Sequence, residues 1–575
     1  NFTPDFTPDF TEPALVEPPP LAQALPTLPS PETEALPPTA PLTPAPLPES
    51  VPLEIPASPG PEPPATVNPE SVPAPSLTCP PLTKTGERAF PIQVIEVVGN
   101  SVLQREIDQQ VACYAGQELT LSDLFNLRSS ITELYIGAGY ITSGAFLPNN
   151  QDLGDEAVQI QVVEGSIETI QVNGLTRLSD RYVTDRLARA IESPFNQQAL
   201  EDGLQLLQID PALARVNAEL TVGSRPGQSL LIVELEEAET FGLSLGSNNY
   251  RSPSIGSEGI NAGLTVNNPL GFGDRLTVNY GTTNGLSLYD VGYSLPLNSQ
   301  GGTAQFRISN SDSRIVQDAF RDIGIRSDTT TLSAGIRQPL WRTPSEEFAI
   351  GLDFDWKRSQ SYILEDIPFS FSAGPEAGLS QVSALRFSQD WVRRSQTRVL
   401  AARSQFSLGL DLFDATVNDS GIDGQFFAWV GQFQWIEQFS PRFLLLTRFS
   451  AQLTPDALLP VERFSLGGVS TVRGYPQNQI VTDNALTASV EARIPVSKDP
   501  TKVQITPFID VGAGWNTLTP NPNPNVLLGT GVGVRWLVTP NIFVRVDYGI
   551  PLISTTDGGG SLQENGLYFL VDYIP

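Results

Sequence analysis

The sequence predicts a transmembrane antiparallel β-barrel of about sixteen strands, preceded by two small α+β domains and a disordered Pro-rich N-terminal segment. Three observations predict this fold. From about Thr240 onward, segments of about ten residues alternate apolar and polar side chains between clusters of Gly, Pro, Asn, Asp and Ser. Before that, one order of predicted elements occurs twice. The first 81 residues have a composition that cannot bury a core.

The N-terminal segment, assigned to residues 1–88, is rich in proline and acidic. Residues 1–81 hold 26 of the 51 prolines, ten acidic residues and no lysine or arginine. Such a segment stays extended and solvated, close to polyproline II. We expect a passive solvated tail, with a stiff spacer or a ligand for a receptor of Pro-rich motifs as the alternatives.

The first α+β domain is predicted over residues 89–165. A β-rich run from Ile92 to Val98 is followed by two helical patterns, and strands are expected at 141–147 and 157–163. The apolar positions of the helical patterns recur at three- and four-residue spacing, at Leu103, Ile107 and Val111 and then at Leu124, Leu127, Ile131, Leu134 and Tyr135. The order is β-α-α-β-β, typical of a small α+β domain.

The second domain, residues 166–238, repeats this order. A strand ends at Asn173-Gly174, helices are expected near 182–191 and 196–208, and strands near 216–222 and 230–235. A repeat with a period of about 75 residues indicates tandem domains rather than one larger fold.

Residues 239–575 are assigned to the barrel. Apolar Leu486, Val490 and Ile494 alternate with polar Thr487 and Glu491, so one face of the strand is apolar and the other is charged. A soluble β-sandwich is the alternative, but its exposed aromatics would need a second sheet to cover them. Aromatic residues on one strand face or near segment ends instead indicate membrane-interface girdles: Phe427, Trp429, Phe433, Trp435, Tyr548, Tyr568 and Tyr573. The sequence contains no run of 18 apolar residues, so it predicts no membrane-spanning helix.

Composition excludes several classes of function. The chain has no histidine, so it cannot form a Ser-His-Asp triad, a Cys-His pair or a histidine-ligated metal site. The formal net charge of −29 disfavours nucleic acid as a partner, because binding phosphates needs a basic surface. No cofactor and no metal are expected.

Two segments stand out within the barrel region. The connection 454–483 is unusually long, and it carries Val472-Arg473-Gly474-Tyr475. Further on, alternation turns Phe508, Asp510 and Gly512 to the lumen and Ile509 and Val511 to lipid. By itself each motif is weak, and an ordinary surface loop is the alternative for the first. The glycines of 529–533 are interpreted as barrel packing, because no strand-turn-helix context for nucleotide binding surrounds them.

Taken together, these features resemble the TpsB transporters of two-partner secretion, the hemolysin activation/secretion family, over residues 90–575. Tandem β-α-α-β-β domains, the barrel and the two lumen motifs carry the resemblance. Further landmarks are Tyr135 with Gly139-Tyr140, Glu164-Gly165, Asn268-Pro269-Leu270-Gly271 and Gly467-Gly468. The resemblance implies that the two small domains are POTRA domains in the periplasm and that the barrel lies in the bacterial outer membrane.

The resemblance also implies a function. The POTRA domains would recognise a secreted exoprotein with an N-terminal secretion domain, and a monomeric barrel surrounded by outer-membrane lipid would export it without ATP. The loop would fold into the lumen, where Arg473 pairs with Asp510 and Glu491 is an additional acceptor. Some family members plug the barrel with an N-terminal helix, but residues 1–81 are too Pro-rich to form one.

Alternatives remain at this stage. A barrel-assembly or insertion factor of the same superfamily shares the loop motif, and a passive porin would not need two periplasmic domains. An enzyme is disfavoured, because an ion pair with Arg473 would hold both Glu491 and Asp510 ionised. In an oxidising periplasm Cys79 and Cys113 are expected to form a disulfide, with two free thiols as the alternative.

Overall fold

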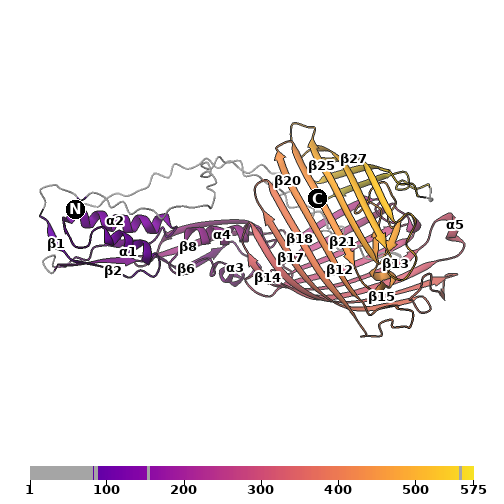
Figure 1. Cartoon of the computed structure of the whole chain (residues 1–575), viewed down its shortest axis with the longest axis horizontal. Coiled ribbons are helices and arrows are strands. Elements are labelled where there is room, and N and C mark those ends of the chain that lie inside the picture. Colours follow the sequence, from indigo (N-terminus) through magenta and orange to yellow (C-terminus); the bar gives the residue numbers. More distant parts are fainter. Residues whose placement is uncertain (1–81, 83–87, 150, 152–155, 556–559) are drawn as a thin grey trace.

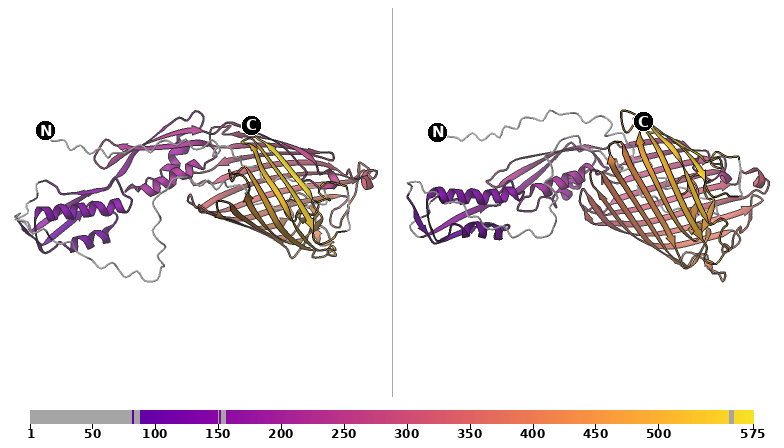
Figure 2. Two further views of the ribbon diagram at one scale, coloured as in Figure 1. Left: turned by 90° about the horizontal axis from the view of Figure 1, so that it is seen from above. Right: turned by 45° about the horizontal axis from the view of Figure 1, so that its top comes forward.

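The computed structural model describes residues 82, 88–149, 151, 156–555 and 560–575. Two α+β units lie in a row beside one end of a large barrel, as Figures 1 and 2 show. The expectations for the Pro-rich segment and for Cys79 lie outside the described residues.

The first unit contains a mixed sheet covered by two helices. Strand β2 pairs in parallel with β5, and β4 pairs with β5 in antiparallel, while β1 and β3 form a separate small ladder. The elements are β1 (Phe90–Ile92), β2 (Val94–Val98), α1 (Gln104–Ala112), β3 (Gln117–Leu119), α2 (Leu121–Gly137), β4 (Gly144–Phe146) and β5 (Ala157–Val163).

Local sequence explains where the long helix of this unit begins. The Thr120 side chain accepts from the Asp123 backbone, and the Asp123 side chain accepts from the Thr120 backbone, which forms a capping box. Helix α2 then buries Leu124, Leu127 and Ile131 in the core of the unit, as the helical spacing predicted. Strand β4 is shorter than the predicted 141–147, because residues 141 and 142 form a turn.

The second unit has the same arrangement. Strand β6 pairs in parallel with β8 and β7 pairs with β8 in antiparallel, with two helices against the sheet. The elements are β6 (Ser166–Asn173), α3 (Asp180–Leu187), α4 (Gln197–Gln208), β7 (Leu213–Val222) and β8 (Gln228–Glu237). The recurring order of elements that the sequence predicts is therefore present.

The two units are joined by a compact hydrogen-bonded junction. Asn196 caps α4 by accepting from the backbone N–H groups of Gln198 and Ala199, and its amide donates to the Ala138 carbonyl at the end of α2, at 3.0 Å. The Phe195 N–H donates to the Gly165 carbonyl at 2.7 Å. One side chain thus connects the end of a helix in one unit to the start of a helix in the other.

Sixteen long antiparallel strands close into a barrel, and β9 pairs with both β10 and β29. The short strand β16 (Ile367–Pro368) pairs in antiparallel with the end of β15. The strands are β9 (Phe241–Asn248), β10 (Gly259–Asn267), β11 (Arg275–Thr283), β12 (Leu286–Pro296), β13 (Thr303–Arg314), β14 (Arg326–Arg342), β15 (Glu346–Ile363), β17 (Leu379–Arg394), β18 (Arg398–Leu410), β20 (Phe427–Ser440), β21 (Phe443–Leu453), β25 (Asn484–Pro495), β26 (Val503–Trp515), β27 (Val526–Thr539), β28 (Ile542–Pro551) and β29 (Leu567–Tyr573).

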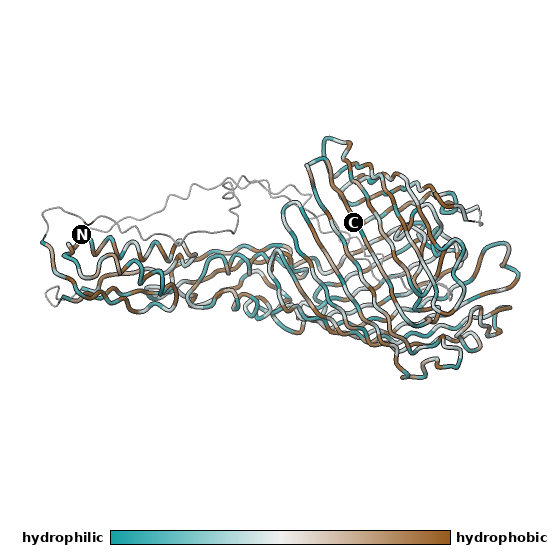
Figure 3. The backbone as a smooth tube through the Cα atoms, viewed as in Figure 1, coloured by the Kyte–Doolittle hydropathy of each residue, from teal (hydrophilic) through white to brown (hydrophobic). Residues whose placement is uncertain are grey.

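Alternation decides which face of each strand is apolar. Leu486, Val490 and Ile494 are exposed on the outside of β25, whereas Thr487 and Glu491 are buried on the inside. Figure 3 shows hydrophobic and hydrophilic positions alternating along the strands. The apolar outer belt that an outer-membrane barrel needs is present. In the described part of the chain, none of the helices is long and apolar enough to span a membrane.

One girdle assignment was wrong. Tyr568 is fully buried, whereas Tyr548 and Tyr573 are exposed. Tyr568 and Tyr573 are an odd number of positions apart on β29, so their side chains leave opposite faces of the strand. Tyr568 therefore belongs to the lumen and not to the membrane interface.

The second unit meets the barrel at the turn that follows β10. The Arg177 guanidinium donates to the carbonyl of Asn268 at 2.8 Å and to the hydroxyl of Thr240 at 2.9 Å. Since β9 starts beside this unit and neighbouring strands are antiparallel, the connection 454–483 between β21 and β25 leaves the barrel at the opposite end. Short elements outside the connection 454–483 include η2 (Pro253–Ile255), α5 (Asp318–Arg321) and β19 (Ile422–Asp423).

Candidate functional site

The connection 454–483 folds back into the barrel rather than extending away from it. Within it, β23 (Phe464–Leu466) and β24 (Ile480–Thr482) form a short hairpin, preceded by β22 (Ala457–Leu458) and η3 (Pro460–Glu462). We call residues 454–483 the lumen loop. Its apolar residues pack against the barrel wall in one buried cluster: Phe464, Leu466, Val472, Tyr475 and Ile480 of the loop with Ala485 and Leu527.

At the tip of the lumen loop, Arg473 lies against Asp510 of β26. The Nε atom is 2.7 Å from Oδ2 and Nη2 is 2.9 Å from Oδ1, so the guanidinium holds the carboxylate with two parallel hydrogen bonds. The Arg473 backbone N–H donates to the same Oδ2 at 3.1 Å. Both side chains are 1% exposed, so this ion pair is removed from solvent.

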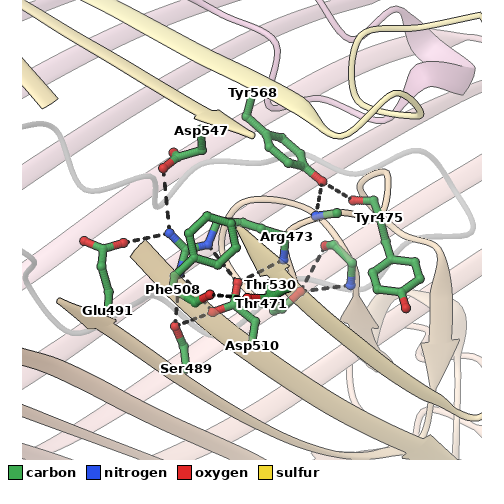
Figure 4. Close-up of polar contacts among 12 residues, drawn as sticks. Thr471, Arg473, Tyr475, Ser489, Glu491, Phe508, Asp510, Thr530, Asp547 and Tyr568 are labelled. Atoms are coloured by element: carbon green, nitrogen blue, oxygen red, sulfur yellow. Dashed lines mark hydrogen bonds and ion pairs between the residues drawn. The ribbon is translucent and has the colours of Figure 1, made fainter. Parts of the chain in front are cut away.

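Further charged groups complete the surroundings of Arg473. Its Nη1 lies 2.7 Å from Glu491 Oε2 and 3.8 Å from Asp547 Oδ1, on β25 and β28. Arg545 bridges the same two carboxylates, at 3.2 Å from Glu491 and 2.6 Å from Asp547. Figure 4 shows the Arg473 guanidinium among these wall residues, and the Phe508 ring lies 3.4 Å below its central carbon. Neighbouring cations and carboxylates thus offset one another's charge.

The other motif residues position this arginine. The Gly474 N–H donates to the Tyr568 hydroxyl at 2.9 Å, and that hydroxyl donates to the Tyr475 carbonyl at 2.6 Å. The Tyr475 hydroxyl lies 2.9 and 2.8 Å from the carbonyl oxygens of Leu528 and Ile553. Gly474 has φ +99°, a conformation that other residues rarely adopt. The tip is therefore held through its backbone as well as through its charge.

Glycines on the inner face of the wall provide the space for the tip. A Cβ atom at Gly512 would come within 2.8 Å of a Val472 methyl group, and one at Gly549 within 2.4 Å of the Gly474 nitrogen. Gly529, Gly531 and Gly533 lie inside β27, with no helix after them, consistent with packing rather than nucleotide binding.

The start of the lumen loop makes a second buried ionic contact, which the sequence analysis missed. Glu462 of η3 lies 2.9 Å from Lys357 of β15 and 2.9 Å from Arg386 of β17. Alternation along β15 does turn Asp353, Asp355 and Lys357 inward, but it does not show which loop residue they meet.

The chemistry of this site is ionic contact between a loop and a wall. Arg473 holds both Asp510 and Glu491 in ion pairs. Among the residues that the structure describes, no group of three or more Cys, Asp and Glu side chains is arranged to hold a metal ion. The site therefore holds the tip of the lumen loop against the barrel wall.

The cysteines lie far from this site along the chain. Cys113 directly follows α1, is largely buried and is disulfide-bonded. Cys79, the partner expected from the sequence, lies outside the described residues.

Comparison with known proteins identifies the family. The family described as "Haemolysin secretion/activation protein ShlB/FhaC/HecB" matches residues 227–536, and the "POTRA domain, ShlB-type" matches residues 90–165. This chain belongs to the ShlB/FhaC/HecB family. It is an outer-membrane β-barrel transporter of the two-partner secretion type, and its POTRA region is periplasmic.

Individual relatives of the ShlB/FhaC/HecB family agree with this assignment. The chain is 28% identical over 439 residues to the outer membrane transporter CdiB of Escherichia coli, covering 71% of this chain and 70% of that protein. It is 24% identical to the heme/hemopexin transporter protein HuxB of Haemophilus influenzae, covering 47% and 48%. The solved structure of CdiB from Escherichia coli shares the fold, with a TM-score of 0.65 at 24% identity over 87% of this chain and 93% of that chain.

Proposed function

We propose that this transporter exports a secreted polypeptide carrying an N-terminal secretion domain, which its periplasmic units recognise before the barrel conducts it outward. The observation that carries the proposal is the position of the lumen loop, whose Arg473 forms an ion pair with Asp510 inside the barrel. The two units are attached to the same barrel through Arg177. This contact is noncovalent, so it can be broken and formed again as the loop moves.

Recognition is assigned to the two periplasmic units, with the second as a further POTRA domain over residues 166–238. Each unit has a three-stranded sheet with two edge strands, β2 and β4 in one and β6 and β7 in the other. An extended peptide can add to such an edge through main-chain hydrogen bonds. The junction at Asn196 keeps the two sheets in a defined relation while the partner binds.

Export is assigned to the barrel without ATP, driven by folding of the partner outside the cell. The barrel is assigned as a monomer surrounded by outer-membrane lipid. Its support is the pairing of β9 with β29, which closes the sheet within one chain and so satisfies its backbone without a second copy.

The test is surface secretion of a candidate partner from cells that make the intact protein, the Arg473→Ala variant or neither. We expect export with the intact protein and a loss of more than about tenfold with Arg473→Ala, since a group buried in an ion pair is removed. Arg398→Ala is the matched control, because the half-exposed Arg398 pairs with Glu437 on β18 and β20, which are not among the strands that Arg473 contacts.

Other outcomes would contradict the proposal. Equal export by Arg473→Ala and the intact protein would show that the Arg473–Asp510 ion pair has no part in export. No export in any strain, together with general loss of outer-membrane barrels when the gene is deleted, would make this chain an assembly factor instead. In each strain, heat-dependent electrophoretic mobility reports whether the barrel has folded.

A further inference from the structure

The lumen loop makes a buried ionic contact at its start as well as at its tip. We infer that Glu462 is a second anchor of this loop and that, together with Arg473, it holds the loop across the lumen. In this inference Glu462 is a positioning residue for transport, and that role of Glu462 rests on the proposed export function.

The contacts of Glu462 are those of a built ionic site. Arg386 Nη2 donates to both carboxylate oxygens, at 2.9 and 3.0 Å, and Lys357 Nζ lies 2.9 Å from Oε1. The side chains of Glu462, Lys357 and Arg386 are 7%, 5% and 11% exposed. A carboxylate this deeply buried needs cationic partners to remain charged, and two wall strands supply them.

The wall side of the site is itself preorganised. Arg386 also contacts Asp355 at 2.6 Å and donates to the Ser407 hydroxyl at 2.7 Å. Two cations and two carboxylates therefore meet in this cluster, and only Glu462 comes from the loop. If Glu462 left, Arg386 would keep its contact with Asp355 but Lys357 would lose the carboxylate that lies 2.9 Å from its Nζ, so the wall is complementary to the loop residue.

The two anchors lie on separate parts of the wall. Glu462 contacts β15 and β17, whereas Arg473 contacts β25, β26 and β28, and β18, β20 and β21 lie between these groups in the closed barrel. Only residues 463–472 connect the anchors. This length of chain reaches at most about 35 Å when extended, which is enough to connect the two parts of the wall inside the barrel.

Apolar packing follows the same division. The start of the loop packs on the β17 and β20 side, in the cluster that joins Ala457, Leu458, Leu459 and Val461 to Val382, Ala384, Ile422, Phe426 and Ala428. The hairpin and the tip pack instead against Ala485 and Leu527. Releasing Arg473 alone would therefore leave the first half of the loop in place, and clearing the lumen requires that Glu462 also leaves its cations.

The test measures the pore itself, which needs no partner protein. Full-length protein is reconstituted in planar lipid bilayers, and the open fraction of single channels is compared among the wild type, Glu462→Gln, Arg473→Ala and the double variant. We expect at least a threefold increase for Glu462→Gln and a larger increase for the double variant than for either single change. Glu462→Asp retains the charge and should stay close to the wild type.

A control variant and a second measurement distinguish an anchor from a merely structural residue. Glu437→Gln removes an equivalent carboxylate whose partner, Arg398, is half-exposed and does not touch the lumen loop, and it should leave the open fraction unchanged. A nitroxide attached at Pro455→Cys, an exposed position in the half of the loop that Glu462 holds, reports motion directly. It should become more mobile in Glu462→Gln and stay immobile in Glu437→Gln.

The outcomes separate this inference from the proposed function. A folded Glu462→Gln protein with wild-type open fraction and an immobile label would overturn the second anchor. If Glu462→Gln does not fold, Lys357→Gln tests the same contact from the wall side, and unchanged gating there would be equally decisive. Altered gating in a protein that never exports a partner would keep the anchor and reject the proposed function.

Discussion

The carbonyl oxygen of Arg473 occupies the position where a side chain at Gly529 would begin. A Cβ atom built on Gly529 would lie 1.9 Å from that oxygen, far inside van der Waals contact. The absence of a side chain on β27 is therefore what allows the tip of the lumen loop to approach the wall closely enough for Arg473 to reach Asp510.

Gly529→Ala should displace the tip of the lumen loop and weaken the ion pair between Arg473 and Asp510. Because backbone atoms on both sides must move, we expect a cost of about 1–3 kcal/mol, typical of overpacking in a closely packed region. The free energy of unfolding in urea and the export of the partner measure the effect. Gly242→Ala is the control, since a Cβ there would meet its nearest neighbour at an ordinary 3.7 Å. Equal effects of the two changes would contradict this prediction.

The Arg473–Asp510 contact should show strong coupling. Arg473→Met takes the cation from the buried Asp510 carboxylate and should cost about 3–5 kcal/mol of stability. Asp510→Asn should cost less, because Arg473 keeps its ion pair with Glu491. The double variant should cost clearly less than the sum of the single changes, because it removes both members of the pair. A double-mutant cycle in urea measures the coupling, and additive costs would mean that the contact carries no energy of its own.

Tyr475→Phe tests the contact of the Tyr475 hydroxyl with the backbone of the barrel wall. The change removes a hydroxyl that lies between the backbone of Leu528 and Ile553 and takes one hydrogen-bond partner from these part-buried carbonyl groups. We expect a loss of about 1–3 kcal/mol and an increase in pore opening. Tyr548→Phe, on the exposed outer face of β28, should change neither quantity.

Glu164 should make the first POTRA domain sensitive to acid. Burial acts to raise the pKa of this carboxyl, but hydrogen bonds from Ser101, Tyr135 and Val102 lower it below its usual value. A carboxyl with a lowered pKa stabilises the folded state above its unfolded pKa of about 4.3, and this contribution is lost as the pH falls through the folded pKa.

The measurement is hydrogen exchange of the Ser101 and Val102 amides in the full-length protein. Glu164→Gln should reduce their protection factors by about tenfold or less at neutral pH, as expected for a partly exposed charged hydrogen-bond acceptor. The difference from wild type should shrink as the pH falls below about 4. A difference that stays constant with pH would show that the charge of Glu164 is not responsible.

The sequence alone was sufficient for the barrel and for the side of the wall on which each residue lies. Two-residue alternation is a local property of a strand, so Asp510 and Glu491 could be turned inward and Ile509 outward without knowledge of the fold. The same rule, applied to residue spacing on the last strand, would have moved Tyr568 from the girdle to the lumen, where the structure has it.

Only the tertiary structure decided which inward residues meet. Strand order around a closed barrel and the course of a thirty-residue loop through its interior are non-local, so no periodicity places Glu462 between Lys357 and Arg386. The same holds for Gly529 and the carbonyl of Arg473, which are far apart in sequence and are brought together by the fold. Local patterning thus determined the faces of the elements, whereas packing of the loop against the closed wall determined the site, because contacts across a lumen depend on the whole barrel.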